Sequence, residues 1–290
     1  MRTVLLVNGQ QVDIVNQQDF YGIHEFFKLF NVVDKDPELS FEIRQKDEVK
    51  IYYCKKVMAI ISKGKRIKPL SPKYCKDGTG PSVDITLPEV LKSEALIKKY
   101  FKQAKDIAYK HSKKAEFAVQ QNISLGSRCF DEGLVVVDME WGFSQGDIPE
   151  KQRISKTQID LVAVNPKVNE NGENDIYLVE VKHSLDATEG DSGMQDHVNK
   201  TNEICNCHAA CEALIEDVKA IIDQKVELGI LTGNKPDFKF SRVPKMLFFL
   251  SYRSQDELSS LERQVAKLDI PTGMTTPVVQ YYNYTIPLSL

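Results

Sequence analysis

Two stretches of sequence decide the fold: Gln158-Ile-Asp-Leu-Val-Ala-Val164 and Ile176-Tyr-Leu-Val-Glu-Val-Lys182. Both are short and rich in β-branched and other apolar residues, which is typical of buried strands. The connection between them is polar and contains Asn171-Gly172, a dipeptide that favours tight turns. The sequence therefore predicts two strands, over 157–164 and 175–182, that pair as an antiparallel hairpin.

The polar residues of this hairpin are its most informative feature. The turn sets Asp160 opposite the end of the second strand, where side-chain alternation places Glu180 and Lys182 on one face. Two carboxylates can hold Mg²⁺, and a neighbouring lysine can orient a water and offset charge in a transition state. In the alternative interpretation, Asp160 is an edge charge, and Glu180 and Lys182 close the strand as a surface ion pair.

The elements around the hairpin predict an α/β fold. Apolar periodicity and end signals indicate a helix over 88–111, a strand over 133–141, the two hairpin strands, a helix over 194–228 and a strand over 245–251. A helix over 255–268 and a strand over 278–286 follow. The order α-β-β-β-α-β favours helices packed on a mixed sheet.

The first 85 residues predict a separate, β-rich domain. Asn8-Gly9 joins two apolar runs in a hairpin pattern. A short amphipathic helix over 19–30 and strands over 40–44, 50–54 and 57–62 follow. A cluster of turn residues over 76–81 marks the boundary, so we expect an N-terminal domain over 1–85 and a second domain over 86–290.

Composition excludes several classes of protein. A chain of 290 residues predicts about two domains. The sequence has no run of 18 apolar residues and no signal-peptide pattern, so we expect no membrane span. Six cysteines without a secretion signal indicate reduced thiols and a cytoplasmic location. The phosphate-binding loop of ATPases and the nucleophile elbow of α/β-hydrolases do not occur.

Charge is distributed unevenly along the chain. Residues 51–115 carry 16 basic against 5 acidic side chains, whereas the net charge of the whole chain is −3. Lys98, Lys102 and Lys105 on the expected helix could contact nucleic-acid phosphates, and so could Gln195 and His197 at the start of the following long helix. The alternatives are a solvated lysine face and the polar beginning of a helix.

Four residues on the expected long helix invite a metal-site interpretation. Cys205, Cys207, His208 and Cys211 carry side chains that can bind zinc. However, their spacing does not match paired Cys-x-x-Cys knuckles, and on a continuous helix Cys205 and Cys207 point in different directions. We therefore expect small core cysteines rather than a zinc or iron–sulfur site.

The hairpin and the element order together resemble a known superfamily. Ile159-Asp160-Leu161 followed by Glu180-Val181-Lys182 is similar to the signature of the PD-(D/E)XK, or restriction-endonuclease-like, nucleases. The resemblance covers about residues 88–252 and implies an αβββαβ core. Ile159 stands where many members have proline. Asn199 stands where the exonuclease-like members have the tyrosine of a Gln-x-x-x-Tyr motif.

The resemblance implies roles for individual residues. Asp160, Glu180 and the backbone carbonyl of Val181 would bind Mg²⁺ or Mn²⁺, and Lys182 would be the catalytic lysine. Many members add an acidic residue from the first core helix. Here the candidates for that position are Glu94 and Glu116.

The expected function is a metal-dependent nuclease that hydrolyses phosphodiester bonds, in DNA rather than RNA. One alternative is a catalytically inactive module of the same fold that acts in nucleic-acid binding or protein assembly, because fold does not fix function. Another is an unrelated α/β interaction protein. The N-terminal domain would recognise the substrate, a partner protein or a second copy in a homodimer.

Overall fold

The computed structural model describes residues 4–7, 10–13, 23–44, 48–54, 56–62, 66–69, 90–110, 115–143, 157–190 and 192–283. It confirms an α/β protein with two main sheets. Contacts divide the chain into two units, residues 1–126 with 220–232, and residues 127–219 with 233–290. The boundary expected at 85/86 lies outside the described residues, and the contacts divide after Gly126 instead.

The first unit is built on an antiparallel sheet of four strands in the order β3-β4-β5-β6. Its elements are β1 (Val4–Val7), β2 (Gln10–Asp13), α1 (Ile23–Asp34), β3 (Ser40–Arg44), β4 (Glu48–Tyr53), β5 (Lys56–Ser62), β6 (Arg66–Pro69), α3 (Glu94–Lys110) and α4 (Ala115–Gly126). The predicted N-terminal hairpin is confirmed, since β1 and β2 pair antiparallel up to Val7 and Gln10.

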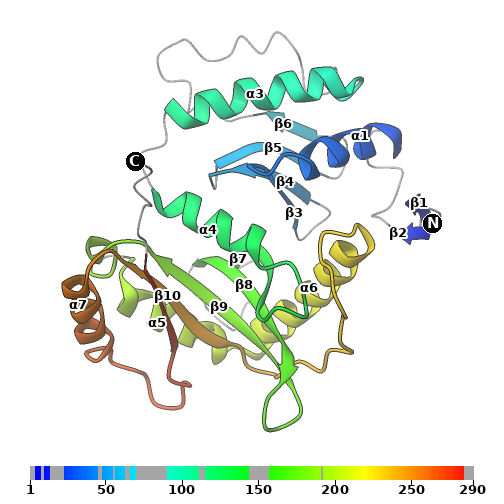
Figure 1. The fold of residues 1–290 in the computed structure, drawn as a ribbon. Coiled ribbons are helices and arrows are strands. Elements are labelled where there is room, and N and C mark those ends of the chain that lie inside the picture. The colour runs from blue at the N-terminus through cyan, green and yellow to red at the C-terminus, as the bar shows by residue number, and fades with distance from the viewer. Residues whose placement is uncertain are drawn as a thin grey trace. The chain divides into compact units, whose positions relative to one another are not determined.

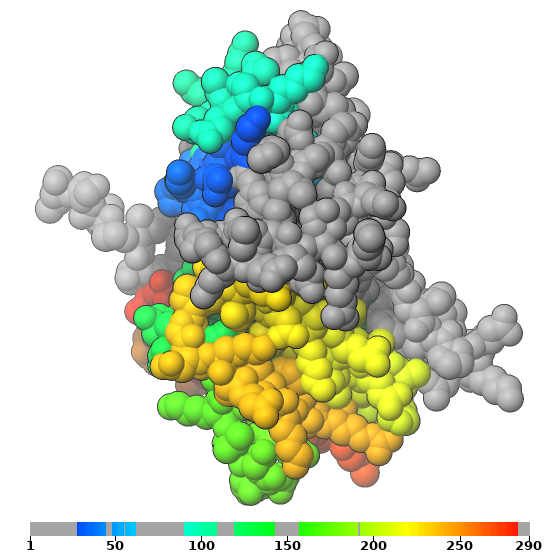
Figure 2. Space-filling model, turned by 90° about the vertical axis from the view of Figure 1, so that its right-hand side faces the viewer, coloured from blue at the N-terminus to red at the C-terminus, as the bar shows by residue number. Residues whose placement is uncertain are grey.

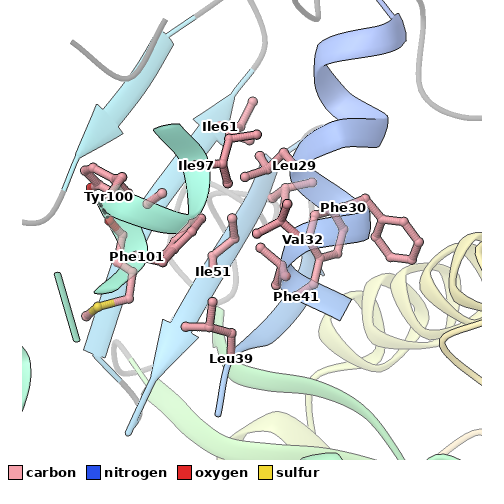
Figure 3. Close-up of a cluster of buried hydrophobic side chains, with 14 of the residues drawn as sticks. Leu29, Phe30, Val32, Leu39, Phe41, Ile51, Ile61, Ile97, Tyr100 and Phe101 are labelled. Atoms are coloured by element: carbon pink, nitrogen blue, oxygen red, sulfur yellow. Dashed lines mark hydrogen bonds between the residues drawn. The ribbon is translucent and has the colours of Figure 1, made fainter. Parts of the chain in front are cut away.

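Helices α1 and α3 pack their apolar stripes into the core of this unit (Figure 3). Ile97 and Phe101 of α3 are buried with Leu29 of α1 and Ile51 of β4. The hydroxyl of Tyr100 donates to the carbonyl of Met58 at 2.7 Å. The apolar row that predicted α3 therefore packs against the four-stranded sheet. This packing explains why the contacts place the helix in the first unit.

Residues 220–232, which end helix α6 (His208–Glu227) and follow it, complete the first unit. Leu228 and Ile230 belong to its core. Lys225 Nζ pairs with Glu42 Oε2 of β3 at 2.5 Å, and both side chains are fully buried. The hydroxyls of Ser40 and Ser124 also donate to Glu42. Residues distant in the sequence thus neutralise the one charge that β3 buries among the described residues.

The second unit contains a mixed sheet of five strands in the order β11-β10-β9-β8-β7 (Figure 1). Strands β7, β8 and β9 are antiparallel, and β10 is parallel to both β9 and β11. The elements are β7 (Val135–Phe143), β8 (Thr157–Val168), β9 (Asn174–Lys182), η3 (Leu185–Ala187), α5 (Met194–Cys205), α6 (His208–Glu227), β10 (Lys245–Tyr252), α7 (Gln255–Val265) and β11 (Val278–Asn283).

Helices cover both faces of this sheet. On one face, Met194 of α5 and Leu261 of α7 pack with Phe248 of β10. On the other face, the indole nitrogen of Trp141 in β7 donates to Asp217 of α6. The predicted helix over 194–228 is in fact two helices that break at Asn206 and Cys207. No described helix combines the length and apolarity needed to cross a bilayer.

The tip of the β8–β9 hairpin is anchored to the segment that precedes β10, and Figure 2 shows the two side by side. Asn174 exchanges backbone hydrogen bonds with Lys239 and Ser241. The carboxylate of Asp175 accepts from Asn169, Ser241 and Lys245. These contacts fix the register of the hairpin that carries Asp160 and Glu180.

Candidate active site

Strands β8 and β9 separate at the position of Asp160. Their ladder ends at Leu161 and Val179, although β8 begins at Thr157 and β9 continues to Lys182. Beyond that point β8 still pairs with β7, and β9 still pairs with β10. Asp160 Oδ2 accepts a hydrogen bond from the backbone N–H of Val181 at 3.0 Å, so a side chain takes the place of the ladder partner.

Because the two strands separate, the backbone of Val181 faces the Asp160 carboxylate instead of a partner residue in β8. The N–H and C=O of a residue in an antiparallel strand face the same neighbouring strand. Because the N–H of Val181 points toward Asp160, its carbonyl faces the same side. The register that pairs Leu161 with Val179 also sets Asp160 opposite Glu180 on one face of the sheet. The structure thus brings the predicted carboxylates and the Val181 backbone together.

Glu180 and Lys182 form a buried ion pair. Lys182 Nζ lies 2.8 Å from Glu180 Oε1, and both side chains are 5% exposed. The ammonium also donates to the carbonyl of Ser192 at 2.8 Å. Ser192 has a φ of +70°, a left-handed conformation that is uncommon outside glycine. The expected alternative of a surface ion pair does not hold, because this pair is buried.

His197 approaches Glu180 from helix α5. It belongs to the buried stripe of that helix, with Met194 and Val198 on either side. Its Nδ1 lies 3.1 Å from Glu180 Oε2 but makes no well-aligned hydrogen bond with a described residue. Burial, together with the positive charge of Lys182, lowers the pKa of His197 to about 4. The imidazole is therefore neutral at pH 7, and this close approach is not an ion pair.

The donor set suits a hard divalent cation in part. Asp160, Glu180 and the Val181 carbonyl offer oxygen ligands, which Mg²⁺ and Mn²⁺ accept, with water filling the remaining positions. Within the described ranges, no three His, Cys, Asp or Glu side chains are grouped closely enough to hold an ion. The protein would therefore supply two carboxylates and a backbone oxygen, and Asp160 would have to exchange its hydrogen bond for the ion.

The other predicted contact residues lie elsewhere. The side-chain amide of Gln195 donates to the backbone carbonyl of Asp269 and accepts from its N–H, so it ties α5 to the segment after α7. Lys98 and Lys102 are exposed on α3. Lys105 is held by two carboxylates of its own unit, Asp36 and Glu38. His197, expected to reach a phosphate, is buried against Glu180.

The two candidates for an acidic ligand on the first core helix are not brought to the site by any described contact. Glu94 is exposed in the first turn of α3. The side chain of Glu116 lies outside the described residues. Both helices belong to the first unit, whereas Asp160 belongs to the second.

The cysteines of the predicted cluster are buried or half-buried. Burial raises the pKa of Cys205 to about 12 and that of Cys211 to about 11, so both remain protonated thiols. Cys211 Sγ lies 3.3 Å from the carbonyl of Ile204, and His208 pairs with Glu212 on the surface of α6. Among the described residues, no group of three such side chains could hold a metal ion.

Sequence reasoning missed Glu140. The pairings of Met139 with Leu161 and of Trp141 with Ile159 place it on β7 opposite Asp160. Its φ is +55°, and the β7 ladder contains an irregularity between Val136 and Asp138. Neither a bulge nor a left-handed glutamate has a sequence signal, so only the structure could show that an acidic residue occupies this position of β7.

No protein-family model, curated protein or solved structure matches this chain. The geometry of Asp160, Glu180, Lys182 and their neighbours is therefore the main guide to the function of this chain.

Proposed function

We propose that this protein is a metal-dependent nuclease that hydrolyses phosphodiester bonds, with DNA as the expected substrate. The observation that carries the proposal is the convergence of Asp160, Glu180 and the Val181 backbone where β8 and β9 separate, with Lys182 alongside. The resemblance of these residues to the PD-(D/E)XK signature supports it, as does the three-strand meander followed by the parallel strand β10.

Asp160, Glu180 and the Val181 carbonyl would hold Mg²⁺ or Mn²⁺. When bound, such an ion polarises a phosphoryl group and lowers the pKa of a coordinated water. The ammonium group of Lys182 has three N–H donors, of which one binds Glu180 and a second binds the carbonyl of Ser192. The third donor would orient the attacking water and offset negative charge as the phosphodiester opens.

The experiment is a cleavage assay on plasmid, linear duplex, single-stranded DNA and RNA, with Mg²⁺, Mn²⁺ or EDTA. Wild type is compared with Asp160→Asn, which keeps an acceptor for the Val181 N–H, and with Lys182→Met. Matched controls are Asp237→Asn and Lys167→Met, which change exposed residues of the same unit. We expect metal-dependent cleavage that both site variants lose and both controls keep. Cleavage that survives Asp160→Asn would contradict the proposal.

The alternative function is a catalytically inactive module that binds nucleic acid or assembles with a protein. It is favoured by the contacts of the two carboxylates, which bind Lys182 and the Val181 N–H. Calorimetric titration with Mn²⁺ separates the two functions. A nuclease binds the ion in wild type and binds it weakly in Asp160→Asn, whereas an inactive module binds it in neither.

A further inference from the structure

The first unit contains an open pocket formed by the end of α1, the segment that follows it and the middle of α3. Its volume is about 460 Å³, which falls within the range of ligand-binding pockets. Four lysines line it, namely Lys35 after α1 and Lys98, Lys102 and Lys105 on α3. Asp36 is the acidic residue among the described residues of the lining. The pocket thus presents mainly positive charge, which attracts anions.

The contacts of Lys105 leave the other three lysines available to a ligand. Lys105 Nζ lies 2.8 Å from Asp36 Oδ2 and 2.7 Å from Glu38 Oε2, so this ammonium is already neutralised within the unit. The other three lysines of the lining are exposed, and none of them has an ion pair or hydrogen bond with a residue that the structure describes. Lys105 and its two carboxylates carry one net negative charge, which the three other ammonium groups outweigh.

Two contacts between helices fix the walls of this pocket. The ion pair of Lys105 joins α3 to the segment after α1. Near the start of α3, Lys28 Nζ of α1 donates to the backbone carbonyl of Lys92 at 3.4 Å. Val32 of α1 and Phe101 of α3, both labelled in Figure 3, pack in the core of the unit. The pocket is therefore preorganised, so an anion need not order the two helices when it binds.

The lining suits phosphate groups better than bases. Lys98 and Lys102 are four residues apart on α3, so their side chains project from one face of the helix. Phe101, the aromatic residue of the described lining, is only 2% exposed, so a base cannot stack on its ring. Lysine ammonium groups bind phosphates as point charges, and such contacts carry no sequence information.

We infer that this pocket binds the phosphate groups of a nucleic-acid backbone through Lys35, Lys98 and Lys102, without preference for sequence. The choice of nucleic acid as the ligand rests on the proposed function. Phosphate contacts set the position of a strand and supply most of the affinity of sequence-independent binding. The first unit would thus contribute to holding the substrate, while the second unit carries the chemistry.

The test measures DNA binding by the full chain in EDTA, where metal-dependent cleavage does not proceed. Fluorescence anisotropy of a labelled duplex gives the dissociation constant between about 50 and 200 mM salt. The test variant is Lys98→Met/Lys102→Met. The matched control, Lys99→Met/Lys167→Met, removes the same charge from exposed lysines outside the described lining. Circular dichroism and a urea titration confirm that both variants fold.

The expected result is a smaller salt dependence in the test variant. Each lysine–phosphate contact with a duplex contributes about 0.9 to the slope of log affinity against log salt concentration. We expect the slope to flatten by about 1.8 in the test variant and by less than about 0.9 in the matched control. The affinity should fall equally for duplexes of different sequence. Equal slopes in the two variants, or a wild type that does not bind DNA, would overturn the inference.

A second measurement distinguishes a nucleic-acid backbone from a small anion. Wild type and the test variant are titrated by calorimetry with a nucleoside diphosphate and with inorganic phosphate. If either probe binds wild type alone while the salt slope for DNA is unchanged, the pocket serves a small anion and the inference fails.

The outcomes also separate this inference from the proposed function. Metal-dependent cleavage by a protein whose salt slope is the same in Lys98→Met/Lys102→Met would leave the nuclease standing and overturn the role of the pocket. Conversely, DNA binding that depends on the pocket, in a protein that cleaves no substrate, would support the role of the pocket and contradict the nuclease.

Discussion

Lys182 and Glu180 illustrate how a buried charge depends on its partner. The two side chains are 2.8 Å apart and almost fully shielded from water. Removing the lysine leaves a carboxylate in a poorly solvated place, so we expect Lys182→Met to lower the free energy of unfolding by about 3–5 kcal/mol. Urea denaturation measures this change. The double variant Glu180→Gln/Lys182→Met should lose less than the sum of the single losses. Strict additivity would contradict the coupling.

The lowered pKa of Asp175 makes the stability of the fold depend on pH. Burial alone would raise its pKa, but hydrogen bonds from Lys245 and Asn169 outweigh burial and lower it. A carboxyl group with a lower pKa in the folded state stabilises the fold above its ordinary pKa of about 3.9 and loses this contribution as the pH falls through its folded value. Wild type should therefore lose stability below about pH 4 more steeply than Asp175→Asn. Parallel curves from thermal melts would contradict this account.

At the scale of elements, the start of α5 depends on a close backbone approach at Gly193. A Cβ atom at this position would lie 2.7 Å from the carbonyl oxygen of Thr188 and from the carbonyl carbon of Glu189. We expect Gly193→Ala to destabilise the protein by about 1–3 kcal/mol, because backbone atoms must move. Gly142→Ala is the matched control, since its Cβ would meet only ordinary contacts near 3.9 Å. Equal melting temperatures for the two variants would refute the prediction.

Sequence patterns predicted the elements better than their partners. The β8–β9 hairpin was predicted because alternation and the Asn171-Gly172 turn are local signals. The break between α5 and α6 was not, since Asn206 ends the helix through bonds to Asn202 inside an apolar periodicity that continues. The pair of Asp160 with Glu180 followed from the predicted register. The turn of His197 toward Glu180 did not, because a histidine on a buried stripe has no preferred partner in the sequence.

At the scale of the whole molecule, the division of contacts could not be predicted, because it depends on residues far apart in the chain. The sequence pattern predicts α3 as the first helix of the nuclease-like core, yet its apolar row packs against the four-stranded sheet of the first unit. Residues 220–232 return to that unit after nearly a hundred intervening residues. An apolar face shows that a helix is packed, but it does not show which sheet covers it.

This division predicts the behaviour of fragments. A fragment of residues 1–126 lacks Leu228 and Ile230 from its core and leaves Glu42 buried without Lys225. We expect it not to unfold cooperatively, whereas Glu42→Gln in the fragment should restore part of its stability by removing a buried charge that has lost the ammonium of Lys225. Near-ultraviolet circular dichroism during a thermal melt measures cooperativity. A sharp transition in the unaltered fragment would show that the first unit folds without the returning segment.

The hydrogen bond from the Val181 N–H to Asp160 can report whether a metal ion is bound at the candidate site. The amide proton of Val181 is bound to a side-chain carboxylate rather than to a backbone carbonyl of β8. Any ion that takes this carboxylate oxygen competes with that proton, so the Val181 resonance in a nitrogen–proton correlation spectrum should move upfield and its solvent exchange should quicken as diamagnetic Mg²⁺ or Zn²⁺ is added. The amide signal of Val181, measured at a saturating concentration of the ion, can thus show whether an ion is bound where β8 and β9 separate. This measurement needs neither substrate nor turnover.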